Sequence, residues 1–224
     1  MRHWPLTQLI LTTPDLVLRI PDDDQLDVLA QVAADGVLPP GAVYFPQPWA
    51  SGSPEETARN VVQNHWWARG DWREDNWRLL LAVFHEGKPI GQQNLSARSF
   101  RITREARTGF WLGRRYQGRG FGTQMRFAAL HLAFDHLDAE RVTSCAFADN
   151  AASRRVSEKL GYTPNGVRRL TADGRLVEVH DAVITAHDWA RSVQPATPAE
   201  GVDGCRHLFG LPSAAPPVDV ILHV

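Results

Sequence analysis

A glycine-rich segment between a predicted strand and a predicted helix constrains this chain more than any other feature. Residues Gln117–Thr123 read Gln-Gly-Arg-Gly-Phe-Gly-Thr. They follow a short apolar run at 108–112 and precede apolar residues that recur at helical spacing from Met125 to about His136. Such a loop points unpaired backbone amides at one spot near the positive end of a helix dipole, and its glycines let an anion come close. The segment therefore predicts a phosphate-binding loop, although a strand-to-helix turn without a ligand could have the same composition.

Two common phosphate-binding motifs do not fit these residues. A dinucleotide-binding G-x-G-x-x-G sequence starting at Gly118 needs a glycine where Thr123 stands. A P-loop needs Gly-Lys-Ser/Thr after four intervening residues, and no lysine stands there. A mononucleotide-binding protein would explain the glycine segment and nothing else in the chain.

The order of predicted elements indicates a mixed α/β fold. The aspartates at 22–24 offer N-cap oxygens to a first helix, and the capping box at 53–56 opens a second helix that runs to about Gly70. Asn150 or Asp149 caps a later helix. The predicted strands are 16–20, 79–85, 90–97, 108–112, 141–147, 162–170 and 176–184. Two hairpins among them, the second with an Asp-Gly type I′ turn at 173–174, favour a mostly antiparallel sheet of six or seven strands with about four helices.

Tryptophans cluster around the end of the second predicted helix, at Trp66, Trp67, Trp72 and Trp77. They are typical of packing in a core, but pockets too are largely apolar and aromatic, so these side chains could also line an acceptor site. The preceding stretch 36–52 is rich in proline and aromatic residues and should form an ordered, irregular loop that could shape a pocket wall.

Charge and composition limit which classes of molecule this chain is expected to bind. With 24 basic and 25 acidic residues the formal net charge is -1, so no overall field would hold the chain on nucleic acid or on a membrane. No run of about 18 apolar residues occurs. Cys145 and Cys205 are too few and too far apart for a disulfide or metal framework. We therefore expect a cytoplasmic protein without a metal that binds small molecules or peptides, and homo-oligomerisation stays open.

Two motifs carry a resemblance to a known family. The glycine segment fits a Gln/Arg-x-x-Gly-x-Gly/Ala signature, read as Gln117-x-x-Gly120-x-Gly122, and Asn150-x-x-Ser153 is followed by Glu-Lys-Leu-Gly-Tyr at 158–162. The chain thereby resembles the GNAT superfamily of acyl-CoA-dependent N-acyltransferases, in particular its RimJ/RimL-like branch. The sequences at 2–6 and 202–206 are also similar to a mycobacterial subgroup described as using succinyl-CoA. We expect an acyltransferase domain over residues 1–192, and a C-terminal tail or docked extension over 193–224.

The resemblance implies a GNAT-like sheet that is splayed where acetyl-CoA or succinyl-CoA enters. The backbone at 111–113 would pair with the pantetheine arm, and 117–123 would cradle the pyrophosphate. Asn150 and Ser153 would face the thiol end, although Asn150 could also be a plain helix N-cap. The predicted cofactor-binding residues are Trp111, Leu112, Gly113, Gln117, Gly118, Arg119, Gly120, Phe121, Gly122, Thr123, Asn150 and Ser153.

The predicted reaction is transfer of an acetyl or succinyl group to a primary amine of a protein N-terminus, a lysine or a small molecule, by direct attack. Ser157 stands where many GNAT enzymes have a tyrosine acid, so it could relay a proton to the departing thiolate or be an ordinary helix serine. No spacing selects a base among four candidates, and the resemblance slightly favours the last two of them. The candidates are His85, Glu178, His180 and Asp181. The missing tyrosine leaves a CoA-binding or regulatory module without turnover as an alternative.

Overall fold

A computed structural model describes residues 1–39, 41–192 and 197–212 of the 224-residue chain. Its strands form one sheet in the order β7-β8-β6-β5-β4-β3-β2-β1-β9, in which every neighbouring pair is antiparallel except β5 and β6. The strands are β1 (Ile10–Thr12), β2 (Val17–Arg19), β3 (Asn76–His85), β4 (Lys88–Arg98), β5 (Glu105–Leu112), β6 (Arg141–Phe147), β7 (Thr163–Ala172), β8 (Arg175–Thr185) and β9 (Ala199–Glu200). The predicted mixed α/β class and mostly antiparallel sheet are confirmed, with nine strands in place of six or seven.

The two additional strands are short and lie together at one edge of the sheet. β1 has three residues and β9 has two, and they pair with each other at Ile10↔Glu200 and Leu11↔Ala199. Strands of this length carry no readable alternation of apolar and polar residues. Their pairing joins segments far apart in the sequence, so only the tertiary structure reveals it.

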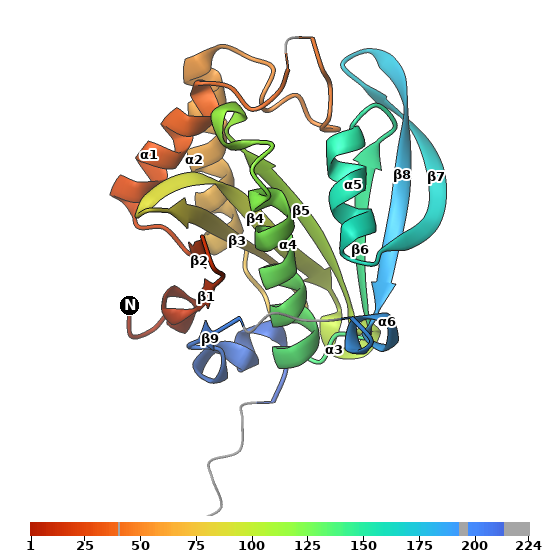
Figure 1. Ribbon diagram of the computed structural model, residues 1–224. Helices are drawn as coiled ribbons and strands as arrows, with labels where there is room; N and C mark the ends of the chain where they lie inside the picture. The colour runs from red at the N-terminus through yellow and green to blue at the C-terminus, as the bar shows by residue number, and fades with distance from the viewer. Residues whose placement is uncertain (40, 193–196, 213–224) are drawn as a thin grey trace, which may run out of the picture.

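Helices cover both faces of the sheet (Figure 1). The core on one face is built from α1, α2, β3 and β5 side chains, and α4 packs its apolar side on the opposite face. The helices are η1 (Pro5–Gln8), α1 (Asp23–Ala34), α2 (Pro54–Gly70), α3 (Phe100–Thr103), η2 (Arg114–Tyr116), α4 (Phe121–His131), η3 (Leu132–His136), α5 (Ala151–Lys159), α6 (Ala186–Ala190) and η4 (Asp203–Phe209). The four predicted helices correspond to α1, α2, α4 and α5. None of the described helices is long and apolar enough to cross a membrane.

Local signals in the sequence place several of these boundaries correctly. Asp22 and Ser53 each form a capping box, accepting hydrogen bonds from the backbone amides of Gln25 and Glu56. Asp173 and Gly174 both have positive φ, at 50° and 69°, as the predicted type I′ turn requires.

The described part of the C-terminal segment, residues 197–212, packs on the rest of the chain. η4 buries Cys205 and Phe209, and the Phe209 ring meets the Trp77 ring edge-on at a centroid distance of 4.9 Å. Trp72 stacks on Trp77 in the same cluster. Trp77 is therefore a core residue, and Trp72 is a partly buried residue that packs against the core. The proline-rich stretches at 194–198 and 212–217 lie mostly outside the described residues.

Candidate active site

The sheet opens between its two parallel strands. β5 and β6 pair only at Glu105↔Arg141, Ala106↔Val142 and Arg107↔Thr143, and then diverge while each keeps its other neighbour. The β6-facing edge of β5 beyond Arg107 therefore has backbone groups with no partner strand. The segment between α1 and α2 reaches over the opening, where Tyr44 packs beside Phe147 of β6 (Figure 1).

A cavity of about 530 Å³ occupies this opening, and we call it the cofactor cavity. It is lined by Val37, Leu38, Pro39, Tyr44, Phe45, Phe110, Trp111, Leu112, Gln117, Gly118, Gly120, Gly122, Thr123, Asp149, Asn150, Ala151, Ala152, Ser153, Arg155, Val156 and Lys159. The cavity thus joins the glycine segment and the start of α5, which the sequence had linked only through the resemblance.

The glycine segment presents a run of free backbone amides at the N-terminus of α4. Among the described residues, no hydrogen-bond acceptor lies opposite the N–H groups of residues 118–122, and the N–H of Thr123 is the first to bond, to the Gly120 carbonyl at 3.0 Å. Gly118 and Gly120 have φ of 76° and 86°, and a β-carbon added to either would meet no atom within 4 Å. Both glycines also line the cofactor cavity, so the segment borders open space, and unpaired amides beside such space favour binding of an anion.

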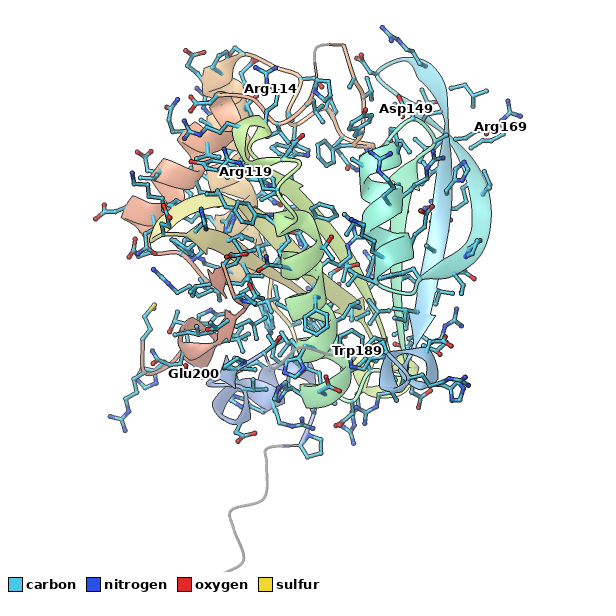
Figure 2. The ribbon with its side chains drawn as sticks, in the orientation of Figure 1. Arg114, Arg119, Asp149, Arg169, Trp189 and Glu200 are labelled. Atoms are coloured by element: carbon cyan, nitrogen blue, oxygen red, sulfur yellow. The ribbon has the colours of Figure 1, made fainter. Side chains whose placement is uncertain are left out.

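Cationic side chains surround the cavity. Arg155 and Lys159 line it from α5, and Figure 2 shows Arg114 and Arg119 around the start of α4, with Asp149 across the gap beside α5. An anionic ligand would be favoured here. Arg155 was not predicted from the sequence, and Lys159 was interpreted as a solvated side chain, although their spacing of four residues on the helix face of Ala152 and Val156 was a readable signal.

Three predicted cofactor-binding residues lie outside the cavity lining. Gly113 packs against α1, where an added β-carbon would come within 2.6 Å of Val32. Phe121 is buried with its ring 4.6 Å from that of His85. The Arg119 guanidinium lies near the Tyr116 ring. The Gly113 backbone and the side chains of Phe121 and Arg119 therefore hold or flank the loop.

Gln117 and Asn150 have structural partners of their own. The Gln117 amide nitrogen donates to the carbonyls of Val37 and Leu112, at 2.9 Å each, and ties the end of β5 to the segment after α1. Asn150 accepts from the backbone amide of Ser153 at 3.1 Å, so it is the N-cap of α5. It also lines the cavity with Ser153, which makes the capping and ligand-facing roles compatible.

Ser157 lies beneath the cavity rather than in its lining. Its hydroxyl accepts a 2.7 Å hydrogen bond from Arg126, and donates to the Ser153 carbonyl at 3.3 Å. The Arg126 guanidinium is fully buried over the Phe110 ring, and burial lowers its pKa from the ordinary value. Among the described residues no carboxylate pairs with Arg126, so Ser157 is one of the few groups that compensate this buried cation.

The four candidate bases do not line the cofactor cavity. Asp181 accepts two hydrogen bonds from the Arg168 guanidinium, which lowers the pKa of its carboxyl. His85 bonds through Nδ1 to the Asp15 carbonyl at 3.0 Å. Neither His180 nor Glu178 is part of the lining either.

A second cavity of about 1020 Å³, the inner groove, adjoins the first between α2 and the strands. It is lined by Phe45, Pro46, Gln47, Pro48, Trp49, Asn60, Val61, Gln63, Asn64, Trp67, Arg78, Gln92, Asn94, Gly109, Phe110 and Trp111. Phe45, Phe110 and Trp111 line both cavities. The inner groove thus meets the cofactor cavity along β5, and Trp67, which is 63% exposed, belongs to a cavity wall and not to the core.

His65 lies directly behind the inner groove and was not singled out from the sequence. It is 1% exposed, and burial lowers its pKa from 6.5 to about 4. It is therefore neutral at pH 7, and its Nε2 donates to the Gln92 side-chain oxygen at 2.8 Å.

This burial predicts an acid-sensitive contribution to stability. Unfolded histidine takes up a proton near pH 6.5 and folded His65 only near pH 4, so the unfolded state binds more protons in between and stability falls as pH drops through this window. Between pH 7 and pH 5 we expect a loss of about 2 kcal/mol that His65→Gln does not show. Urea unfolding of both proteins at the two pH values measures it, and parallel losses would contradict the assignment.

Comparison with known proteins identifies the family. The acetyltransferase (GNAT) domain matches residues 15–163. YdaF of Bacillus subtilis, named as a ribosomal N-acetyltransferase, is 28% identical over 102 residues, which is 44% of this chain. The aligned region spans 55% of YdaF, about half its length.

Solved structures share the fold at lower identity. Mycobacterium smegmatis RimJ in complex with CoA-disulfide has a TM-score of 0.64 at 18% identity, covering 84% of this chain and 92% of that one. RimL, the ribosomal L7/L12 α-N-protein acetyltransferase, in complex with coenzyme A has a TM-score of 0.61 at 20% identity, covering 79% of this chain and 97% of that one. With its family match, splayed strands and free amides, the chain belongs to the acetyltransferase (GNAT) domain family.

Proposed function

We propose that this chain transfers an acyl group from acyl-CoA to a primary amine. The observation that carries the proposal is the run of free amides at 118–122, at the mouth of a cavity formed where β5 and β6 diverge. The loop backbone would hold the pyrophosphate, Arg155 and Lys159 would add charge, and the free edge of β5 would pair with the amides of the pantetheine arm. A thioester held there supplies the electrophilic carbonyl.

The acceptor amine would bind in the inner groove, because this groove meets the cofactor cavity at Phe110 and Trp111. Among the described residues that line it, none is a histidine, aspartate or glutamate. The acceptor amine would therefore lose its proton to water and attack in its neutral form. Ser157 would relay a proton from water to the leaving thiolate, giving up its own proton and taking one from water, with Arg126 making its hydroxyl more acidic through their hydrogen bond.

The finer proposal concerns the substrates. The named activities of YdaF and RimL support a ribosomal-protein amine as the acceptor, and acetyl-CoA as the donor. Succinyl-CoA remains the alternative donor, supported by the resemblance at the two ends of the chain. A lysine or a small-molecule amine would use the same chemistry.

Binding of CoA thioesters is expected to raise the melting temperature, because a ligand that binds only the folded state stabilises it by mass action. At a ligand concentration of about 100 times Kd, the gain is about 2.7 kcal/mol. Thermal shift with acetyl-CoA, succinyl-CoA and free CoA measures this, with ATP and NAD as controls. No shift with any of the three CoA compounds would refute the proposal.

A module that binds CoA without turnover is favoured by one observation, the burial of the Ser157 hydroxyl outside both cavity linings. Release of CoA in the presence of ribosomal proteins and a panel of simple amines separates the two functions. Binding without release would select the module.

A further inference from the structure

The inner groove has one charged side chain among the described residues that line it, Arg78. Arg78 projects from β3, and its guanidinium lies over the Trp67 ring at 4.3 Å from the ring centroid. Its Nη1 donates to the Asn64 side-chain oxygen at 3.1 Å. Its Nη2 is buried and has no hydrogen-bond partner among the described residues. A half-buried guanidinium with a spare donor is a ready partner for an anion.

No carboxylate in the described part of the chain neutralises Arg78. Within the described residues it forms no ion pair, and burial lowers its pKa, a change that the nearby charge of Asp71 partly opposes. Asp71 itself lies 3.5 Å from the Arg73 guanidinium. A cation left uncompensated beside a cavity is costly unless a ligand supplies the opposite charge.

A chain of hydrogen bonds orients a second donor toward the groove. His65 donates to the Gln92 oxygen, and the Gln92 amide nitrogen donates to the Asn94 oxygen at 2.6 Å. Because the Asn94 oxygen is occupied, its amide nitrogen is left as a donor, 3.8 Å from the position that a β-carbon added to Gly109 of the groove lining would take. The Asn64 side chain is oriented in the same way: its oxygen accepts a hydrogen bond from Arg78, so its amide nitrogen is left as a donor. Asn64, Asn94 and Arg78 thus line one cavity, and each keeps N–H groups that no acceptor among the described residues takes.

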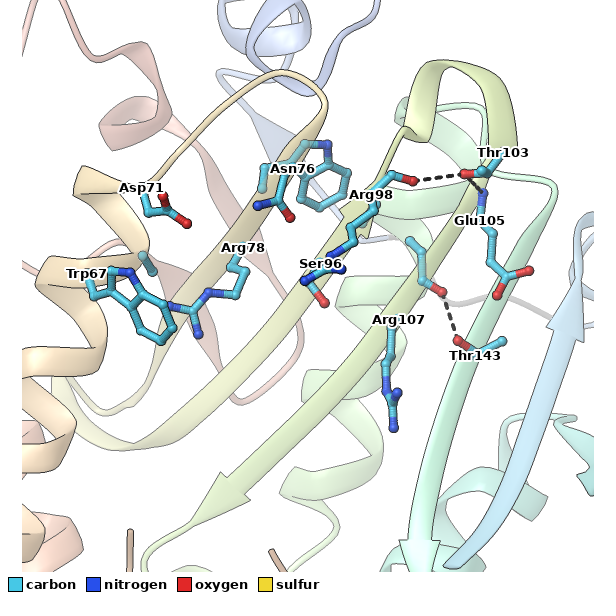
Figure 3. A pocket seen from close by; sticks show the side chains of 14 residues that line it. Trp67, Asp71, Asn76, Arg78, Ser96, Arg98, Thr103, Glu105, Arg107 and Thr143 are labelled. Atoms are coloured by element: carbon cyan, nitrogen blue, oxygen red, sulfur yellow. Dashed lines mark hydrogen bonds between the residues drawn. The ribbon is translucent and has the colours of Figure 1, made fainter. Parts of the chain in front are cut away.

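The positive character continues beyond Arg78 into an adjoining cavity of about 600 Å³, the outer groove, which shares Trp67 and Arg78 with the inner one. Figure 3 shows Arg78 alongside the Trp67 ring, with Arg98 and Arg107 projecting from neighbouring strands. The two acids in the lining face other arginines: Asp71 is near Arg73, and Glu105 is near Arg141 at 3.6 Å. The arginines of the outer groove would draw an anion toward Arg78.

We propose that Arg78, with Asn64 and Asn94, forms a carboxylate-binding subsite that selects an anionic substrate in the inner groove. This rests on the proposed acyl transfer, because the groove is taken as the place where acyl group and amine meet. The carboxylate belongs either to the acceptor, as an acidic side chain close to its amine, or to the end of the acyl chain. Both sources present the same group to the same donors.

Pairs of ligands that differ only in charge test the subsite and separate the two sources. The donor pair is succinyl-CoA and its terminal amide, succinamyl-CoA. The acceptor pairs are short peptides with aspartate at the second or third position and the same peptides with asparagine, measured with and without CoA. In either the donor pair or the acceptor pairs, we expect wild-type protein to bind the carboxylate ligand at least tenfold more tightly than its amide counterpart. This is a difference of about 1.4 kcal/mol in binding free energy, measured by calorimetry.

Variants at position 78 then show whether Arg78 causes the preference for the carboxylate ligand. Arg78→Gln should bring the ratio of the two dissociation constants close to one, and Arg78→Lys should keep part of it because it retains the charge. Arg59→Gln, an exposed arginine of α2 outside both grooves, is the matched control and should change nothing. Equal binding of both members of every pair by wild-type protein, or a preference that survives Arg78→Gln, would overturn the subsite. The proposed function fails on a separate result, the absence of acetyl-CoA binding to the wild type.

Discussion

Gly120→Val is expected to weaken acetyl-CoA binding by about 100-fold or more while the protein still folds. Gly120 has φ of 86°, and its amide belongs to the free run at the start of α4. A valine would leave this left-handed conformation or carry its branched side chain into the space meant for the phosphate. Loss of two charge-assisted hydrogen bonds, each worth about 1.5 kcal/mol, gives a change of this size. Isothermal titration measures it.

Gly87→Val is the matched control. Gly87 also has positive φ, 76°, and an added β-carbon would meet nothing within 4 Å, but it lies in the turn between β3 and β4. Both variants should lose about 1–2 kcal/mol of stability from backbone strain, and only Gly120→Val should lose acetyl-CoA binding. Equal affinity in the two variants would remove the phosphate role of the segment.

Gly122→Val should behave differently from Gly120→Val, although the sequence gives both glycines the same role. Gly122 has ordinary helical backbone, and an added β-carbon would lie 3.3 Å from the Phe110 ring and 3.6 Å from Val156. The missing side chain lets α4 pack against β5 and α5. Its replacement is therefore expected to disturb the cavity wall through Phe110.

Ser157→Ala is expected to lower the free energy of unfolding by about 1–3 kcal/mol. The hydroxyl accepts from Arg126 Nη1 at 2.7 Å, and its loss leaves this donor unpaired at a fully buried site. The Arg126 Nε already has no partner among the described residues, so the guanidinium has little else to compensate it. Urea unfolding measures the loss.

Two further variants show whether the loss comes from the stranded cation. Ser144→Ala removes a serine hydroxyl that is equally buried but has no partner among the described residues, and should cost little. Adding Arg126→Met to Ser157→Ala removes both polar partners and should recover much of the stability, because an apolar pair leaves no group unsatisfied. A double variant less stable than either single variant would contradict this explanation.

The same Ser157→Ala protein tests the proposed proton relay through its turnover. If Ser157 delivers a proton to the thiolate, kcat should fall about tenfold with little change in acetyl-CoA affinity, since the interaction strengthens only in the transition state. An unchanged kcat, measured where chemistry limits turnover, would leave Ser157 as the partner of Arg126 alone.

Local features of this chain could be read directly from its sequence. The N-cap among residues 22–24, the capping box at Ser53, the N-cap at Asn150 or Asp149 and the turn at 173–174 depend on neighbours within a few residues. Their hydrogen bonds form within one turn of chain, so residue type and spacing determine them. The glycine segment belongs to this group, because glycine adopts positive φ at little steric cost, as Gly118 and Gly120 do here.

Contacts between distant segments were decided only by the tertiary structure. β9 pairs with β1 across almost the whole chain, and this pairing extends the sheet beyond the seven strands that periodicity predicts. The clustered tryptophans have different surroundings, because Phe209 packs against Trp77 whereas Trp67 lines a groove. An apolar side chain can be buried or exposed, and the packing of the folded chain decides which apolar side chains are buried.

The polar residues around the two cavities show the same division. Sequence alone predicted a glycine loop before α4 and a helix capped by Asn150 or Asp149, and the structure has Asn150 as that cap. The sequence contained no sign that Ser157 meets a buried Arg126, or that Arg78 is the charged residue of the inner groove, since each depends on which groups lie opposite after folding. The free energy of a charged side chain depends far more on its burial than on its residue type. Burial is a property of the assembled fold.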